Sequence, residues 1–307
     1  MSAARQAPTW VGAEGEAGRG GSGSLLGRDA LGRDLLTRCL LGGAVSLSVG
    51  FAAALIAIVI GTAWGMIAGF AGGRVDAVMM RIVDVLYGLP YILLVVLLAV
   101  AADSIAESRL KRADARAGEQ RAAYVEREGS RVTGEARAAL ESEAARLYPA
   151  PSESSRPMIN LVTLLVAIGG VSWLTMARVV RGQTLSLRAQ PFVHAAEALG
   201  ASTPRILRVH ILPNLAAPII VYATLTIPQA ILQESFLSFL GIGVRPPVPS
   251  WGSLAADGLS ELNPVRSRWW LLVFPCALLA STLLSLNFLG EALREALDPR
   301  AGQARRA

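Results

Sequence analysis

Few side chains in this sequence could do chemistry, and their spacing excludes the common catalytic centres. The histidines His194 and His210 share one polar segment, but they are too far apart, and lack the clustered carboxylates or thiols, for a zinc site. Cys39 and Cys276 each lie in or beside an apolar run, with no second thiol or histidine at ligand spacing. The single lysine, Lys111, stands in a charged stretch and not in a glycine-rich phosphate loop. We therefore expect no catalytic residue, no metal, no cofactor and no ATP hydrolysis by this chain.

Two carboxylates within apolar runs are the remaining chemical signal, because an ionisable group inside a membrane is expensive and often functional. Asp84 follows Arg81 by three residues, so the two side chains can meet on one helical face. Glu234 has no basic residue nearby. A proton-coupled transporter could use Glu234; alternatively, this carboxylate caps or hydrogen-bonds a helix break.

The elements that must position these residues are predicted to be membrane helices. Hydrophobic residues make up 53% of the 307 residues and charged residues only 17%, which is too apolar for a soluble domain. A net charge of +6 in a soluble protein would suggest nucleic acid, but basic residues beside membrane spans usually mark the cytoplasmic side. The sequence therefore predicts an all-α, multi-pass protein in contact with membrane lipid, with no nucleic-acid partner.

Five apolar runs are long enough to cross about 30 Å of hydrocarbon, which takes about 20 residues. They span residues 41–70, 83–102, 158–177, 216–239 and 269–290 of a predicted transmembrane domain, 41–291. Glycines recur at a spacing of four, as at Gly61, Gly65 and Gly69. They either let helix backbones approach closely or reflect the general frequency of glycine in membrane helices.

Arginine placement orients these spans. Arginines gather after the first span, after the third span and in the tail at 292–307, so these three regions are predicted to be cytoplasmic. The opposite, external side then receives the 103–157 insertion and the 241–268 loop, whose Pro- and Trp-rich sequence suits an ordered cap. Residues 1–24 lack the features of a secretory signal and are predicted to be a disordered tail, followed by an amphipathic pre-membrane segment at 25–40.

The 103–157 insertion has nearly balanced acids and bases and favours helix. Oppositely charged pairs four residues apart support helix formation: Glu107 with Lys111, Arg131 with Glu135, and Arg137 with Glu141. Gly129 and Gly134 would interrupt the helix, and Pro149 and Pro151 would end it, so we expect a helical hairpin. A modest apolar stripe is either the seam of that hairpin or a partner contact; it contains Leu110, Ala113, Ala117, Ala136, Ala139 and Leu140.

The segment 190–214, QPFVHAAEALGASTPRILRVHILPN, is a polar, arginine-rich island between two apolar spans. It contains a short Ala-rich helix from Phe192 to Leu199, a break at Gly200–Pro204 and a second helical turn before Leu212 and Pro213. A loop that merely joined two spans would need no such design. The pattern predicts a surface that docks into a partner.

Several segments together resemble one family, the inner-membrane permease subunits of binding-protein-dependent ABC importers of the dipeptide, oligopeptide and nickel group. The matching segments are LGRDALGRDLLTRCLLGGAVSLSVG, GFAGGRVDAVMMRIVDVLYGLP, ARVVRGQTLSLRAQPFVHAAEALGAS followed by HILPN, ESFLSFLGIGVRPPVPSWGSL and ALREALDPR. They cover nearly all of the chain outside its first two dozen residues and the insertion. The resemblance implies a MetI-like type I permease fold in a bacterial inner membrane.

The resemblance also implies partners and a role for segment 190–214. A permease of this family pairs with a second homologous permease, two cytoplasmic ATPase subunits and an external solute-binding protein. Its EAA loop carries a coupling helix that docks on an ATPase and transmits closure of the ATPase pair to the spans. The coupling residues implied in this chain are Phe192, His194, Ala195, Ala196, Glu197, Gly200, Ala201, Leu212 and Pro213.

Two departures from the family pattern affect this expectation. His194 occupies the place of the glutamate in Glu-Ala-Ala, and Glu197, one helical turn away, is a candidate to replace its charge. Family members usually have a further transmembrane helix before the LGTD-like segment, whereas no apolar run precedes Leu25 here. A misassigned start, a lost helix or a helix supplied by a partner would each account for this. With five spans, the N-terminus is expected to be external.

The leading hypothesis is thus a non-catalytic permease subunit of an ATP-driven importer of peptides or a similar small solute. An ion-coupled secondary transporter that uses Asp84 and Glu234 is the alternative. A membrane scaffold without transport is a third. Uptake that persists without any ATPase would favour the second hypothesis, and uptake unchanged by Gly200→Trp would favour the third.

Overall fold

The computed structural model describes residues 7–8, 24–129, 134–149, 151–262 and 267–297. Most of the predicted tail at 1–24 and most of that at 292–307 lie outside these residues. In order, the helices are α1 (Leu35–Ala71), α2 (Gly73–Tyr87), α3 (Tyr91–Gly129), α4 (Glu135–Leu147), α5 (Pro151–Arg188), α6 (Pro191–Ala198), α7 (Thr203–Arg205), the π-helical segment Ile206–Ile211, α8 (Leu212–Phe239), α9 (Trp251–Ser260) and α10 (Trp270–Leu297). Two isolated bridges are the only extended pairings within the described residues.

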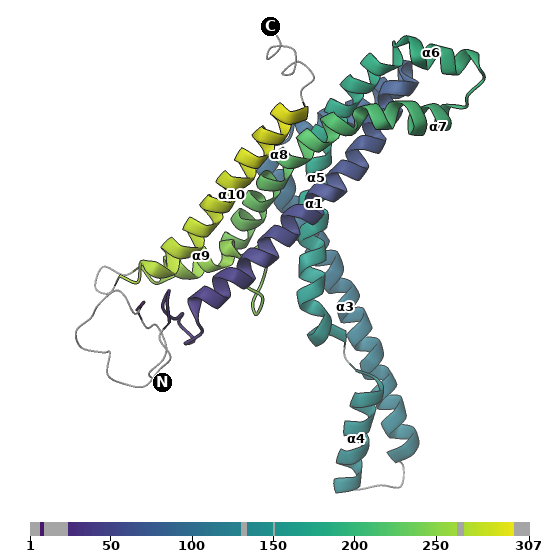
Figure 1. Ribbon diagram of the computed structural model, residues 1–307. Coiled ribbons are helices and arrows are strands. Elements are labelled where there is room, and N and C mark those ends of the chain that lie inside the picture. Colours follow the sequence, from purple (N-terminus) through teal and green to yellow (C-terminus); the bar gives the residue numbers. More distant parts are fainter. Residues whose placement is uncertain (1–6, 9–23, 130–133, 150, 263–266, 298–307) are drawn as a thin grey trace.

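Five of the described helices are long and apolar enough to cross a membrane, which confirms the predicted number of spans. Figure 1 shows them as an elongated bundle, with α6 and α7 at one end and α9 and the start of α1 at the other. The C-terminal ends of α1, α5 and α10 lie towards the α6 end. The described parts of the three arginine-bearing regions, including Arg294 in α10, therefore share one end of the molecule, as the sequence predicts.

The second span begins later than predicted. Residues 83–87 belong to α2, and the chain turns at Gly88–Pro90 before α3 begins at Tyr91. Proline lacks a backbone N–H and disfavours a helical residue before it, so Leu89-Pro90 interrupts the apolar run. The first span differs too, since α1 begins at Leu35 and takes in part of the predicted pre-membrane segment.

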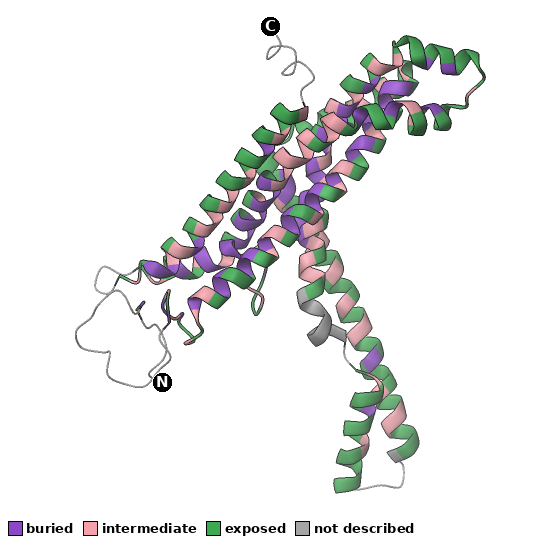
Figure 2. Ribbon diagram, in the orientation of Figure 1, coloured by how far each residue is buried: buried purple, intermediate pink, exposed green. Residues whose placement is uncertain are grey.

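The centre of the bundle is the contact between α1 and α5. A Cβ atom added at Gly65 would lie 2.5 Å from the carbonyl oxygen of Ala177, and one added at Gly61 would lie 2.5 Å from Cβ of Met176. Gly69 meets Thr184 in the same way, at 2.8 Å. The glycines four apart therefore serve close packing of two backbones. Figure 2 shows buried residues concentrated where α1, α5 and α8 run together, while α10 and the projecting α3–α4 arm are mostly exposed.

The insertion forms the helical arm that projects from the bundle in Figure 1. The helix α3 continues from the span into the arm, and span and arm together comprise 39 residues, or about 58 Å at 1.5 Å per residue. Ala117 and Ala144 are buried where α3 and α4 meet, and Arg121 Nε donates to the carbonyl oxygen of Tyr148 at 2.7 Å. Of the predicted apolar stripe, Ala117 therefore lies in the seam, whereas Ala136 and Ala139 are exposed and do not.

The ion pairs of the arm differ in part from those predicted. Arg137 and Glu141 pair at 3.6 Å, whereas Glu107 lies 3.8 Å from Arg245 in the loop before α9. Arg245 also donates to Asp103 at 2.6 Å, so the base of the arm is tied to that loop. Arg131 lies outside the described residues.

Candidate functional site

The helix α6 is held against the end of the bundle by two apolar side chains. Val193 and Ala196 are buried, three residues apart and hence on one helical face. They join an apolar cluster whose members come from α1, α5, the π-helical segment and α8: Phe70, Met176, Val180, Ile206, Ile211 and Leu215. Because the side chain of Ala196 packs within the chain itself, it positions α6 and is not available as part of an outward contact surface.

The opposite face of α6 is exposed and carries most of the residues that the sequence singles out. Phe192 is 40% exposed, and His194, Ala195 and Glu197 are exposed as well. Nδ1 of His194 lies 3.5 Å from a carboxylate oxygen of Glu197, so the two side chains lie side by side on this face. Leu199 is the most exposed large apolar residue here, at 89%, and was missed by the sequence analysis. An apolar residue directly before a helix-ending glycine is the signal that could have identified it.

The turn after α6 leads the chain back to the bundle. Gly200 has φ +76°, which only glycine adopts without strain, and its N–H donates to the carbonyl of Glu197 at 2.9 Å. Ala201 is half-buried, and the rings of Phe192 and His210 lie 6.5 Å apart, which connects α6 to the returning segment. Leu212 and Pro213 are exposed at the start of α8. The nine predicted coupling residues are thus brought together in one structural unit, with Ala196 on its inner side.

Two ion pairs tie α2 to α5 near the same end. Arg181 makes a two-pronged contact with Asp76, with N–O distances of 2.5 and 2.6 Å. Hydrogen bonds from Arg181 lower the pKa of Asp76 below its ordinary value. Arg178 donates to Asp84 at 2.8 Å and stacks over the ring of Tyr87 at 3.9 Å.

The predicted pairing of Asp84 with Arg81 is therefore wrong. The bend at Gly88–Pro90 separates α2 from α3, so α2 lies along α5 and Asp84 meets Arg178 from that helix. The side chain of Asp84 is 55% exposed, so this carboxylate is not buried in an apolar span.

Glu234 is fully buried at the other end of the bundle, close to the end of α8. Its two carboxylate oxygens accept hydrogen bonds from Ser238 at 2.7 Å and Ser235 at 3.3 Å. The hydroxyl groups of Ser46 in α1 and Ser250 before α9 also hydrogen-bond to it. The carboxylate therefore joins α1, α8 and α9 through serine hydroxyls, as in the helix-break interpretation of this residue.

The same serines bind the backbone of the segment that follows α8. Ser238 accepts from the N–H of Val244 at 2.9 Å, and Ser46 accepts from the N–H of Trp251 at 3.3 Å. The indole N–H of Trp251 donates to the carbonyl of Cys39 at 3.0 Å. The predicted external cap is therefore the helix α9, anchored by hydrogen bonds to α1 and α8.

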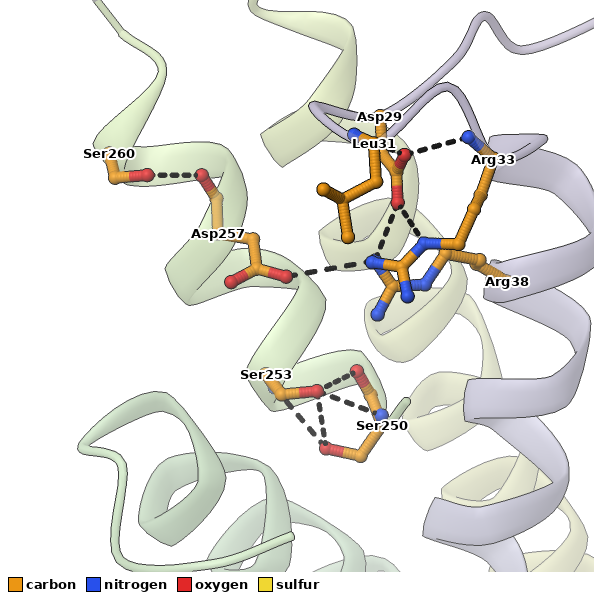
Figure 3. Close-up of polar contacts among 8 residues, drawn as sticks. All are labelled: Asp29, Leu31, Arg33, Arg38, Ser250, Ser253, Asp257 and Ser260. Carbon is orange, nitrogen blue, oxygen red and sulfur yellow. Dashed lines mark hydrogen bonds and ion pairs between the residues drawn. The ribbon is translucent and has the colours of Figure 1, made fainter. Parts of the chain in front are cut away.

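A charged cluster closes this end of the bundle (Figure 3). Asp29 accepts from Arg33 at 2.8 Å and from the buried Arg38 of α1 at 2.7 Å, and Arg38 also lies 3.8 Å from Asp257 of α9. Burial alone would raise the pKa of Asp29, but hydrogen bonds from Arg33, Arg38 and the backbone lower it. Ser250 and Ser253 form a reciprocal cap at the start of α9. The cluster explains how the charged Arg38 can lie inside a helix that starts earlier than predicted.

A cavity of about 500 Å³ lies between α3, α5 and α8, beside the α2–α3 turn. Hydroxyl and amide groups make up the polar part of its wall, and the described residues that line it include no charged side chain. The polar members are Tyr87, Tyr91, Ser172, Thr175, Tyr222, Thr226, Gln229 and Gln233. The sequence analysis missed this set because the residues come from separate helices and follow no linear motif. Within the described residues, no cluster of histidine, cysteine or acidic side chains could hold a metal ion.

Comparison with known proteins assigns this architecture to a family. The family of binding-protein-dependent transport system inner membrane components matches residues 61–303. The dipeptide transport system permease protein DppC of Bacillus subtilis (strain 168) is 39% identical over 274 residues, which are 89% of this chain and 68% of that protein. The oligopeptide transport system permease protein OppC of Escherichia coli (strain K12) is 40% identical over 281 residues, which are 91% of this chain and 73% of that protein.

A solved structure shares the fold. The methionine ABC transporter MetNI in an inward-facing conformation aligns with a TM-score of 0.54 at 15% identity, over 86% of this chain and 98% of that chain. At this identity the likeness concerns the fold alone. Permeases of the matched family work with ATPase subunits and a binding protein, and ATP hydrolysis takes place in the partner subunits.

These findings do not favour an ion-coupled secondary transporter. Asp84 is an exposed ion-pair partner, and Glu234 is enclosed by serines and does not line the cavity. Family, fold and spans agree instead on one assignment. The chain belongs to the binding-protein-dependent transport system inner membrane components and is a non-catalytic, multi-pass inner-membrane permease subunit of an ABC importer.

Proposed function

We propose that this permease forms half of a translocation pathway for dipeptides or oligopeptides, with a second homologous permease as the other half. The observation that carries the choice of cargo is that relatives 39% and 40% identical over about nine-tenths of the chain are named dipeptide and oligopeptide permeases. The cavity between α3, α5 and α8 supports this choice, because its hydroxyl and amide wall suits a polar, amide-rich solute. Among the described residues that line it, no imidazole, thiolate or carboxylate is available to a bare nickel ion.

The exposed face of α6 and the following turn form the site that receives movement from a cytoplasmic ATPase subunit. Phe192 and Leu199 would supply apolar contacts, His194 and Glu197 polar ones, and Ala195 a small surface for close approach. The buried Val193 and Ala196 link this face to α1, α5 and α8. A push on α6 therefore acts on the helices that line the cavity, as a rigid-body alternating-access motion requires.

The opposite end faces the external solute-binding protein. The helix α9 and the base of the α3–α4 arm lie towards this end, and Arg245 ties them together through Asp103. The positive-inside rule supports the orientation, since the arginine-rich regions lie at the α6 end.

Reconstitution of the complete transporter tests this function. Both permeases, both ATPase subunits and the binding protein are placed in proteoliposomes, and ATP-dependent uptake of a labelled tripeptide is measured. We expect uptake that requires ATP and the binding protein. Uptake that continues without the ATPase subunits would contradict the proposal.

Leu199→Asp tests the coupling surface within the same system. We expect loss of ATPase co-purification with the permease still folded, because an exposed apolar contact is replaced by a charge. Leu259→Asp is the matched control, since Leu259 is 48% exposed on α9 at the opposite end. Equal ATPase association of the two variants would refute the role of α6.

A further inference from the structure

A chain of directed hydrogen bonds crosses the wall of the cavity and involves Ser172, Tyr91 and Gln233. The hydroxyl of Ser172 donates its hydrogen to the carbonyl of Ile168, four residues earlier in α5, at 2.8 Å. The hydroxyl of Tyr91 lies 3.3 Å from the oxygen of Ser172. Since a hydroxyl has a single hydrogen and that of Ser172 is already used, Tyr91 is the donor in this contact.

The direction of this chain fixes the orientation of the side-chain amide of Gln233. Tyr91 is also hydrogen-bonded to Gln233. Because Tyr91 has given its hydrogen to Ser172, it can only accept from Gln233, so the NH2 group of the amide faces Tyr91. The carbonyl oxygen Oε1 of Gln233 is then left over, and it is buried with no hydrogen-bond partner in the described part of the chain.

A buried acceptor without a donor is destabilising and is rarely left so in a native protein. Gln233 lines the cavity, as does Gln229, one helical turn earlier on α8. Oε1 itself is shielded from solvent in this conformation, so a solute reaches it only when the side chain of Gln233 turns towards the cavity as the pathway opens. The solute can then satisfy Oε1 by donating a hydrogen bond. The wall carries no charged side chain among the described residues, so it offers no ionic partner to the charged termini of a peptide, and a neutral donor is the group that matches Oε1. An amide N–H needs no such partner.

We infer that Gln233 is a substrate-contacting residue of the permease: its Oε1 accepts a hydrogen bond from a main-chain N–H of the peptide in transit. Tyr91 and Ser172 are positioning residues that hold the amide in this orientation. The inference rests on the proposed peptide-transport function and extends it, because it gives the permease a selective contact of its own beyond the choice made by the binding protein. Such a contact is independent of the side chains of the peptide.

The test compares tri-alanine with its depsipeptide analogue, in which an ester oxygen replaces one main-chain N–H. Both are offered to the reconstituted complete transporter at concentrations that give equal occupancy of the binding protein, measured separately by calorimetry. We expect wild-type uptake of the peptide to exceed that of the depsipeptide about fivefold, the effect of one neutral hydrogen bond. Gln233→Met, which keeps the length of the side chain but removes the amide, should bring this ratio close to one.

Two further variants make the result specific. Gln183→Met is the matched control, since Gln183 is exposed on α5 and does not line the cavity, and it should retain the wild-type ratio. Tyr91→Phe keeps Gln233 but removes the hydroxyl that orients it, so the ratio should fall to a value between those of wild type and Gln233→Met. Tyr91→Phe also provides the test if Gln233→Met does not fold.

The outcomes separate the inference from the function on which it rests. Wild-type uptake that is equal for the two cargoes, or an unchanged ratio in both Gln233→Met and Tyr91→Phe, overturns the role of Gln233 and leaves peptide transport standing. Absence of ATP- and binding-protein-dependent peptide uptake by the wild-type transporter overturns the proposed function itself.

Discussion

The two ends of the bundle hold their terminal helices by different chemistry. At one end, α6 rests on the apolar side chains of Val193 and Ala196. At the other end, α9 also buries apolar side chains, Trp251 and Leu254, but it is anchored in addition by hydrogen bonds that converge on the buried Glu234 and by the ion pairs of Arg38. Apolar contacts have no preferred direction, whereas hydrogen bonds to a buried carboxylate fix both distance and angle. We therefore expect α6 to be able to shift when a partner moves it. We expect α9 to keep one position.

Of the substitutions that test this difference between the two ends, Glu234→Leu is expected to have the largest effect on stability. The substitution removes the acceptor of several buried serine hydroxyls and leaves them unsatisfied, which should lower the free energy of unfolding by about 3 to 5 kcal/mol. Thermal unfolding of the purified permease in detergent measures this, and we expect a fall in Tm of about 10 °C.

Glu234→Gln is the control for this prediction. It keeps the length of the side chain and one oxygen acceptor, so its Tm should lie between those of wild type and Glu234→Leu. A Tm for Glu234→Leu within about 1 °C of wild type would show that α9 is not held by this network.

A smaller and more local effect is expected from Val193→Asp. A charged side chain cannot remain at this buried position, so α6 should detach from the bundle. Detachment should cost about 2 kcal/mol, the free energy gained by burying one valine side chain. Hydrogen exchange of residues 191–199 should accelerate while the Tm of the bundle changes little. Ala195→Asp, on the exposed face of the same helix, should leave the exchange unchanged. If Val193→Asp instead unfolded the whole bundle, α6 would be as tightly coupled to the bundle as α9 is.

The sequence predicted the number of spans and the helix-and-turn form of segment 190–214 but not the contacts between distant helices. Apolar length and arginine placement are local signals, and they identified five spans and the end that carries 190–214. The inward side of Ala196 and the pairing of Asp84 with Arg178 depend on how helices cross, which a linear pattern does not encode. The turn at Gly88–Pro90 was visible in the sequence, but the apolar residues on both sides of it concealed the break.

The cavity wall illustrates the same limit. Tyr91, Ser172 and Gln233 each look unremarkable in their own helices, since single polar residues are common in membrane spans. Only the packing of α3, α5 and α8 brings them into one hydrogen-bonded chain. Sites of this kind can be recognised only in a three-dimensional structure, because their residues lie close together in space but follow no regular spacing in the sequence.

Asp76→Asn tests whether polar contacts at the α6 end contribute less to the free energy of unfolding than those around Glu234. The pair of Asp76 with Arg181 is two-pronged but partly exposed to solvent, so its loss should cost only about 1 kcal/mol. Hydrogen bonds from Arg181 lower the pKa of Asp76, so the folded-state stabilisation is complete at neutral pH and is lost only as the pH falls through that lowered value. The difference in Tm between wild type and Asp76→Asn should therefore be constant from pH 6 to about pH 8. A difference that varied across this range would assign the stabilisation to another group.

The smallest effect is expected from His194→Glu, which restores the glutamate that the family pattern has at this position. The side chains of His194 and Glu197 are both exposed, at 64% and 43%, so the new charge would be well hydrated and its repulsion from Glu197 weak. Association with the ATPase subunit, measured by titration in detergent, should change by less than about twofold. His194→Ala is the companion variant, because it removes the imidazole without adding a charge. Tighter binding by tenfold in His194→Glu alone would mean that a cation of the partner meets this position, and the α6 surface would then act through charge as well as through Phe192 and Leu199.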